Sequence, residues 1–312
     1  MRLAFMGSDE FAIPSLKTVA DEHELLAVVT QPDRPRGRGL KPKPTPVKSA
    51  AEEMGIKVLE PENPNDQGFL ETIRGIGPEL IVVVSYGHIL KADLLNLPPM
   101  GCVNLHPSLL PKYRGAAPIE RAIMNGEEET GITTFFMDEG MDTGDIILQE
   151  KVRIHDDDDA TSLKRRLAEL GSGILSRTLR LIEEGRAPRI PQDHTMATYA
   201  PKIRKEEGDL DWSLPAKRIS NMVRALGDWP GVRTWIDGVE MKLLKVEPME
   251  CEDWKGLVPG TILEKRKDGW VVATGCGCIL VKEVHPLGKR RMTADEYARG
   301  HNIQAGMRFE RR

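Results

Sequence analysis

The sequence contains few aromatic residues, only four cysteines and no long uninterrupted apolar run. A membrane-spanning helix needs about 20 apolar residues, so we expect none, and acidic residues follow the N-terminal apolar stretch too soon for a secretory signal. A net charge of −4 argues against a wholly basic nucleic-acid binder. No pair of metal-binding knuckles is present, so we expect reduced thiols in a cytoplasmic protein at Cys102, Cys251, Cys276 and Cys278.

Motifs of several common enzyme classes are also missing. The first predicted strand, over residues 2–6, leads through a Gly-Ser-Asp turn into a helix without G-x-G-x-x-G, and this excludes a typical dinucleotide site. No G-x-S-x-G elbow is present for a serine nucleophile. A zinc site built from His88, His106 and Asp142 would lack the usual ligand spacing, and we predict no metal.

The hydrophobic pattern divides the chain into two regions. In the first region predicted strands alternate with helices, and the continuous apolar run at 79–85 is typical of a strand covered on both faces. After residue 207 short strand candidates, beginning with 210–212, are separated by glycine turns, which favours a small antiparallel barrel. We therefore predict an α/β domain with a mostly parallel sheet over residues 1–188, a linker over 189–207 and a β-barrel domain over 208–312.

Polar side chains gather near the end of a short predicted strand at residues 101–105. Asn104 and His106 are two residues apart, so an extended chain directs both side chains to one face. Pro107 and Pro111 prevent regular structure after that point, which places the Ser108 hydroxyl in a loop at the strand end. Open α/β sheets bind their ligands at such edges.

An acidic, glycine-rich turn supplies a third candidate, Asp142, after the strand predicted over 131–137. An amide, an imidazole and a carboxylate together suit carbonyl transfer without a covalent enzyme intermediate. Asn104 can donate a hydrogen bond to a developing oxyanion. His106 can donate a second hydrogen bond or move a proton, and Asp142 can orient its imidazole or accept a proton through water.

Residues 31–48 combine six cations with five prolines and two glycines, which predicts a long loop without regular structure. Two interpretations stay open for this loop, a solvated charged surface and a phosphate-binding surface. The candidate phosphate-binding residues are Arg34, Arg36, Arg38, Lys41 and Lys43.

Three motifs, NLHPSLLP at 104–111, YRGAAPI at 113–119 and GMDTGD at 140–145, resemble the 10-formyltetrahydrofolate-dependent formyltransferases. The QPDRPRGRG, VVVSYGHIL and DWSLPAKRI segments extend the resemblance over nearly the whole chain, most closely to members that act on methionyl-tRNA. The resemblance implies a Rossmann-like catalytic domain followed by an oligonucleotide-binding-like barrel. It also implies formyl transfer from 10-formyltetrahydrofolate to the α-amino group of methionyl initiator tRNA, as used in translation initiation.

By matching positions, the resemblance assigns catalysis to Asn104, His106 and Asp142. It places Arg38 near the acceptor end of the tRNA. The implied folate-lining residues are Ser108, Leu109, Leu110 and Pro111. We expect a monomer with no membrane partner.

Two other functions remain open at this point. A related formyltransferase could use a small acceptor, such as an amino sugar, a purine-pathway amine or water, although such an acceptor has no need of a long cationic loop. A non-catalytic RNA-binding protein with a vestigial pocket is the second alternative. The presence of Asn104, His106 and Asp142 together argues against it.

Overall fold

The computed structural model describes residues 1–36, 41–251 and 256–311. The chain divides into two compact units. The first comprises residues 1–118, 129–153 and 163–201, and the second comprises residues 119–128, 154–162 and 202–312. Within the described ranges, no helix is both long enough and apolar enough to cross a membrane.

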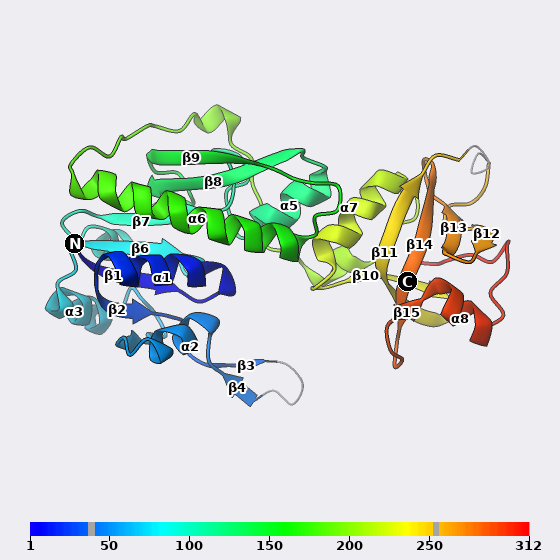
Figure 1. Cartoon of the computed structure of the whole chain (residues 1–312), viewed down its shortest axis with the longest axis horizontal. Coiled ribbons are helices and arrows are strands. Elements are labelled where there is room, and N and C mark those ends of the chain that lie inside the picture. Colours follow the sequence, from blue (N-terminus) through cyan, green and yellow to red (C-terminus); the bar gives the residue numbers. More distant parts are fainter. Residues whose placement is uncertain (37–40, 252–255, 312) are drawn as a thin grey trace. The chain divides into compact units, whose positions relative to one another are not determined.

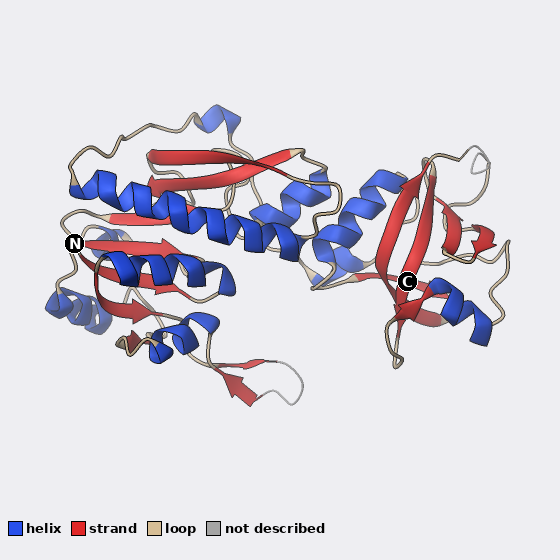
Figure 2. Cartoon of the chain, in the orientation of Figure 1, coloured by secondary structure: helices blue, strands red, loops and turns tan. Residues whose placement is uncertain are grey.

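A seven-stranded sheet forms the centre of the first unit (Figures 1 and 2). Its strands lie in the order β5 (Val58–Leu59), β2 (Glu24–Val29), β1 (Arg2–Gly7), β6 (Leu80–Val84), β7 (Cys102–His106), β8 (Glu129–Phe136) and β9 (Ile146–Arg153). Neighbouring strands from β5 to β7 are parallel, whereas β8 is antiparallel to both β7 and β9. The predicted mostly parallel α/β sheet is confirmed.

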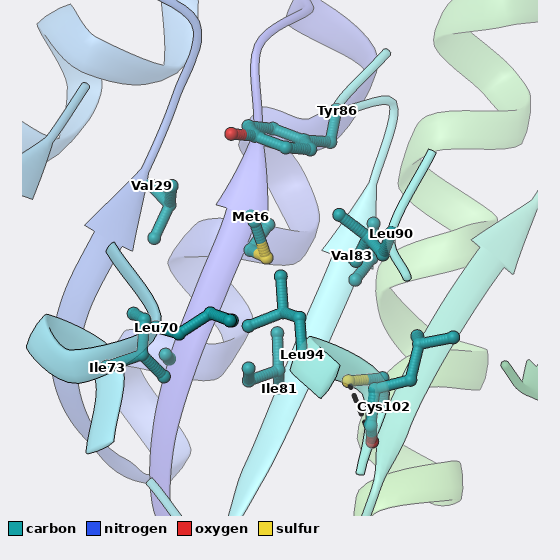
Figure 3. Packing of buried hydrophobic residues seen from close by; sticks show 12 residues of the cluster. Met6, Val29, Leu70, Ile73, Ile81, Val83, Tyr86, Leu90, Leu94 and Cys102 are labelled. Atoms are coloured by element: carbon teal, nitrogen blue, oxygen red, sulfur yellow. Dashed lines mark hydrogen bonds between the residues drawn. The ribbon is translucent and has the colours of Figure 1, made fainter. Parts of the chain in front are cut away.

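Helices cover both faces of this sheet. α1 (Ile13–Glu22) and the long α6 (Ala160–Glu183) lie on one face (Figure 1). α3 (Gln67–Ile76) and α4 (Ala92–Leu95) pack on the other face (Figure 3). The remaining helical segments of the first half of the chain are η1 (Glu10–Ala12), α2 (Pro46–Glu53) and α5 (Pro118–Asn125).

The apolar run predicted at 79–85 forms β6, all five of whose residues are buried. On the α3/α4 face, Met6 and Val83 contact a cluster that includes Leu70 from α3 and Leu94 from α4 (Figure 3). Burial of each such aliphatic side chain contributes about 1.5–3 kcal/mol. This packing fixes the centre of the sheet and hence the position of β7 beside it.

The second unit contains an antiparallel sheet. Its strands lie in the order β10 (Val232–Ile236), β11 (Val239–Met249), β14 (Cys278–Pro286), β13 (Gly269–Ala273) and β12 (Ile262–Arg266), with β15 (Met292–Thr293) beside β14. The C-terminal segment pairs with both ends of this series, through Thr261–Arg308 and Trp235–Glu310, and so closes the sheet as predicted for a barrel. The unit also contains η3 (Lys205–Gly208), α7 (Ala216–Leu226) and α8 (Ala294–Gly300), and η2 (His194–Met196) precedes it in the first unit.

The basic segment differs from its prediction, because it contains regular structure. β3 (Arg34–Arg36) and β4 (Lys41–Lys43) pair as an antiparallel hairpin. Pro35 lies opposite Pro42 in this ribbon. A two-stranded ribbon has two open edges, so a proline that lacks an N–H does not break a central ladder.

Two further expectations were wrong. The first strand of the tail was predicted at 210–212, but those residues form a loop, and the sheet begins at β10. The four cysteines were expected to be reduced, but Cys251 and Cys278 form a disulfide, while Cys102 and Cys276 are free. The pairing of β11 with β14 brings Met249 opposite Cys278, and hence Cys251 close to it, and sequence spacing does not reveal this.

Candidate active site

Asn104 and His106 lie on the same face of β7, as the two-residue spacing predicts. The intervening Leu105 points the other way, toward α6, where a Cβ placed on Gly171 would meet the Leu105 side chain. The two polar side chains therefore lie on the sheet face away from α6. The loop after β7 covers part of this face, because Leu110 packs against Phe135 of β8.

His106 is buried, and each of its ring nitrogens faces an acceptor. Nε2 lies 2.9 Å from the backbone carbonyl oxygen of Tyr113. A carbonyl oxygen only accepts, so Nε2 carries a hydrogen and donates it. Nδ1 lies 3.7 Å from Oδ2 of Asp142, too far for a direct hydrogen bond. Nδ1 is therefore the ring nitrogen available for proton exchange, and the negative charge of the nearby carboxylate would stabilise a proton bound there.

The carboxylate of Asp142 is held by the backbone of the neighbouring loop. The Gly115 N–H donates to Oδ2 at 2.7 Å. Gly115 has φ 116°, and a Cβ at this position would lie 2.9 Å from the carbonyl oxygen of Ala200, so this position requires glycine. Asp142 itself has φ 55° and Tyr113 has φ 59°. Both partners of the imidazole thus occupy the left-handed region, where strain is commonly stored at functional sites.

The route of the chain to Asp142 was not predictable from strand order alone. Because β8 is antiparallel to β7, its last residue, Phe136, lies opposite Val103, near the start of β7 rather than beside His106. The loop after β8 then returns to bring Asp142 to the imidazole. The loop ends at Gly144, where a Cβ would collide with the Phe136 carbonyl oxygen.

Asn104 lies between Val83 of β6 and Phe135 of β8 in the sheet register. Its side chain is partly exposed, and its amide has no hydrogen-bond partner among the residues that the structure describes. Its N–H groups are therefore available to a carbonyl oxygen of a bound substrate, beside the His106–Asp142 pair.

The loop predicted to line a folate site has two kinds of residue. Ser108 is fully buried, and its hydroxyl donates to the Lys112 carbonyl oxygen at 2.7 Å, so it stabilises the loop itself. Leu110 is also buried, and its N–H donates to the Thr133 hydroxyl at 3.2 Å. Leu109 and Pro111 are partly exposed. Any direct ligand contact by this loop is thus easiest for Leu109 and Pro111.

A cavity of about 420 Å³ adjoins the loop that carries Asp142. One wall comes from residues 137–140 at the start of that loop. The other comes from Ala92 and Leu95 of α4 and from Asn96, which follows the helix. Sequence analysis did not identify this cavity, because it depends on the packing of α4 against the end of β8.

The contacts of His88 do not include Asn104, His106 or Asp142. Its ring packs beside that of Tyr86, with centroids 5.4 Å apart, and its Nε2 has no hydrogen-bond partner among the residues that the structure describes. Across the described ranges, no group of three His, Cys, Asp or Glu side chains is placed to hold a metal ion.

Two cations of the basic hairpin, Arg34 and Lys43, are not neutralised by described neighbours. Arg34 lies directly opposite Lys43, both side chains are exposed, and neither has an ion-pair partner within the described ranges. Lys48, which follows the hairpin in the chain, is paired instead. Its ammonium lies 2.9 Å from the carboxylates of both Asp33 and Glu60. Hydrogen bonds to these carboxylates, chiefly to Glu60, raise the pKa of the ammonium. Arg38 lies outside the described residues.

Sequence analysis did not single out Arg114 and Gln192, which support the Asp142 loop by hydrogen bonds. Gln192 donates to the backbone carbonyl oxygens of Asp142 and Gly144, at 2.9 and 2.8 Å. Arg114 in turn donates to the Gln192 side chain. Arg114 stands in the quoted YRGAAPI motif, but Gln192 lies in the segment predicted to be a linker, where no periodicity or motif marks it.

Comparison with known proteins agrees with this geometry. The family model "Formyl transferase" matches residues 1–179, and "Formyl transferase, C-terminal domain" matches residues 202–302. The chain belongs to the formyltransferase family. It is accordingly an enzyme that transfers formyl groups, and the three polar side chains on β7 and its neighbouring loop lie within the first matched region.

Similar formyltransferases include two proteins named methionyl-tRNA formyltransferase. The one from Caldanaerobacter subterraneus subsp. tengcongensis is 49% identical over 98% of this chain and 99% of its own. The one from Moorella thermoacetica is 49% identical over 98% of each chain. A solved N-formyltransferase from Helicobacter canadensis, in complex with folinic acid and dTDP-3-aminofucose, has a TM-score of 0.68 at 20% identity over 89% of this chain and 98% of its own. That likeness shows a shared fold.

Proposed function

We propose that this formyltransferase transfers the formyl group of 10-formyltetrahydrofolate to the α-amino group of methionyl initiator tRNA, giving N-formylmethionyl-tRNA. The observation that carries the proposal is the near-full-length similarity, at 44–49% identity, to proteins named methionyl-tRNA formyltransferase. The exposed cationic hairpin supports a macromolecular acceptor with phosphates over a small amine.

In the proposed reaction the amine nitrogen attacks the formyl carbon, a C–N bond forms, and the bond from that carbon to N10 breaks. The amine loses one proton, and N10 gains one. The addition step converts the formyl oxygen into an oxyanion. Asn104, whose amide is unengaged, donates a hydrogen bond to this oxygen, and preorganised donors of this kind stabilise a transition state by roughly 3–4 kcal/mol.

His106 and Asp142 move the proton in this scheme. The Nε2–H of His106 is committed to the Tyr113 carbonyl oxygen, so Nδ1 is the atom that faces the reaction. Asp142 stabilises a proton on Nδ1 once the amine has released it, either directly after a small closure of the 3.7 Å gap or through water. The same protonated nitrogen then supplies the proton that N10 acquires.

The folate co-substrate is proposed to lie along the loop formed by Ser108, Leu109, Leu110 and Pro111, with its bicyclic ring in the cavity beside α4. The cavity volume of about 420 Å³ and its position next to the Asp142 loop support this placement. No metal takes part in the proposed reaction.

The tRNA is proposed to contact the basic hairpin through Arg34, Arg36, Arg38, Lys41 and Lys43. We propose catalysis in the domain predicted over residues 1–188, RNA contact by the barrel over 208–312, and a connection through 189–207. The protein would act as a cytoplasmic monomer. These assignments rest on the resemblance and on the free charge of the hairpin.

The decisive experiment measures transfer of labelled formyl from 10-formyltetrahydrofolate to initiator Met-tRNA, elongator Met-tRNA and a panel of small amines. We expect a strong preference for initiator Met-tRNA. Equal or faster formylation of an amino sugar or another small amine would favour the alternative acceptor. Absence of transfer to any acceptor by folded protein would leave only a binding function.

A further inference from the structure

The backbone carbonyl of Asp142 accepts a hydrogen bond from one buried glutamine. Gln192 is only 6% exposed. Its Nε2 donates two hydrogen bonds, to the carbonyl oxygens of Asp142 and Gly144, at 2.9 and 2.8 Å. Both donors of one amide group therefore hold the same turn, and Asp142 in that turn has a left-handed φ of 55°. A turn of this shape persists only where surrounding contacts specify it.

The glutamine is itself oriented by a buried arginine. The Arg114 side chain is 2% exposed and donates to Oε1 of Gln192 through Nε at 3.2 Å and through a terminal nitrogen at 2.6 Å. Arginine has no acceptor, so this fork requires the oxygen of Gln192 to face Arg114 and its nitrogen to face the Asp142 turn. The same terminal nitrogen also lies 3.1 Å from Nδ1 of His194.

Arg114 also adjoins the residue that binds the Asp142 carboxylate. Gly115, next in the chain, donates its N–H to Oδ2. The Arg114 backbone is fixed against the 198–200 segment by hydrogen bonds from its own N–H to Thr198 and from the Ala200 N–H to its carbonyl oxygen, at 2.9 and 2.7 Å. Gln192, which accepts from Arg114, thus holds the backbone carbonyl of Asp142, while the Gly115 N–H holds its carboxylate.

We propose that Gln192, oriented by Arg114, is a positioning residue for Asp142 and sets the placement of its carboxylate against Nδ1 of His106. The proposal rests on the catalytic role of Asp142 in the proposed function. Neither residue touches the reacting atoms. A misplacement of about 1 Å at a catalytic group can lower turnover by about 100-fold, so loss of the fork affects the chemical step more than substrate binding.

The test is a double-mutant cycle on the full chain, with 10-formyltetrahydrofolate and initiator Met-tRNA as substrates. Gln192→Met preserves side-chain length and removes both hydrogen-bonding ends. We expect it to lower kcat about tenfold or more, with the KM values for both substrates changed less than about twofold. In an Asp142→Asn background the same substitution should change kcat less than about twofold, since residues that act through one another are not additive.

Gln67→Met is the matched control, because Gln67 is an exposed glutamine on α3 whose side chain, within the described residues, bonds to Glu71 of the same helix alone. We expect its kinetic constants to equal those of the parent protein. Gln192→Glu is the second variant if Gln192→Met does not fold. It keeps the shape of the side chain and an oxygen for Arg114, but it removes the two N–H donors to the turn. It should reproduce the loss of kcat and the coupling to Asp142→Asn.

The outcomes separate this inference from the proposed function. If Asp142→Asn lowers turnover but Gln192→Met and Gln192→Glu leave kcat unchanged, or lower it equally in both backgrounds, the positioning role is wrong. A rise in KM at unchanged kcat also contradicts it, because it would make Gln192 a binding residue. If Asp142→Asn has the parent rate, the catalytic role of Asp142 fails and the positioning role fails with it, although formyl transfer to Met-tRNA would stand. If the parent protein does not formylate Met-tRNA, the proposed function itself fails.

Discussion

The site on β7 and the basic hairpin are both polar, but they are built in opposite ways. Around His106 the polar groups that support the imidazole are buried or bonded: Nε2–H donates to Tyr113, and the Asp142 carboxylate accepts from Gly115. In the hairpin, Arg34 and Lys43 face each other across two strands and are exposed. Like charges placed directly opposite destabilise a sheet.

The difference follows from what each region is proposed to do. Proton transfer and oxyanion stabilisation depend on preorganised groups, so atoms near His106 are fixed by partners. Phosphate binding depends on cationic side chains that can pair with the phosphates of a polyanion, with release of bound counterions. Lys48 is already paired with Asp33 and Glu60, so it is less suited to bind a phosphate. The number of partners of a polar group therefore distinguishes positions suited to chemistry from positions suited to nucleic-acid contact.

The largest expected effect on turnover comes from removing either member of the pair His106 and Asp142, which moves the proton. His106→Ala and Asp142→Asn should each lower kcat about 100- to 10,000-fold, because each removes general acid–base catalysis. Steady-state formylation with saturating folate and Met-tRNA measures the loss, and circular dichroism checks folding. Near-parent rates in a folded variant of either residue would show that the buried pair has only a structural role.

Asn104→Ala should lower kcat about 100- to 1,000-fold, through loss of a donor to the oxyanion. The expected change in KM is small, because a donor that meets the oxyanion contributes mainly in the transition state. Asn104→Asp is the companion variant: it keeps the size but places negative charge by the oxyanion, and it should be at least as slow. A change confined to the folate KM would instead make Asn104 a ground-state binding residue.

Parts of this site were predictable because their geometry is local. The two-residue spacing of Asn104 and His106 places both on one face of any extended strand, and the structure retains that arrangement. The run that became β6 is apolar at every position and therefore indicated a strand buried on both faces. Such features depend on the period of a strand and not on distant partners.

Two of the unpredicted features depend on contacts between distant segments. Gln192 meets the Asp142 turn across 50 residues of sequence, and nothing in its own Pro-rich surroundings marks it. The disulfide of Cys251 with Cys278 follows from the register of β11 and β14. The third feature is local: residues 34–36 and 41–43 pair despite their prolines, since those prolines occupy positions where a ribbon tolerates a missing N–H.

The hairpin is tested by the double variant Arg34→Ala/Lys43→Ala. We expect the KM for Met-tRNA to rise about tenfold, while the folate KM and the turnover of bound substrate stay near parent values. The slope of log(kcat/KM) against log salt concentration should fall by about two, one for each lost phosphate contact. Arg74→Ala, an exposed arginine on α3, serves as the control. Unchanged tRNA kinetics and salt slope in the double variant would identify the hairpin as solvated surface.

The smallest expected effect is on the free energy of unfolding, and it concerns a charge pair to which we assign no role in the reaction. Within the second unit, Arg121 donates to both carboxylate oxygens of Glu207, at 2.5 and 2.9 Å, and this hydrogen bonding lowers the pKa of Glu207. A lowered folded-state pKa gives stability that is present above the unfolded value of about 4.3 and is lost as the pH falls through the folded value.

Glu207→Gln should therefore lower the free energy of unfolding by about 0.5–1 kcal/mol at pH 7, and by less near pH 3, where the parent carboxylate is itself protonated. Thermal melts across this range measure the difference, and kcat should not change. If Glu207→Gln lowered kcat with little effect on stability, a fixed polar pair of the second unit would influence the chemistry. The distinction between fixed catalytic groups and free binding charges would then need a third class, groups that act on the site through the barrel unit.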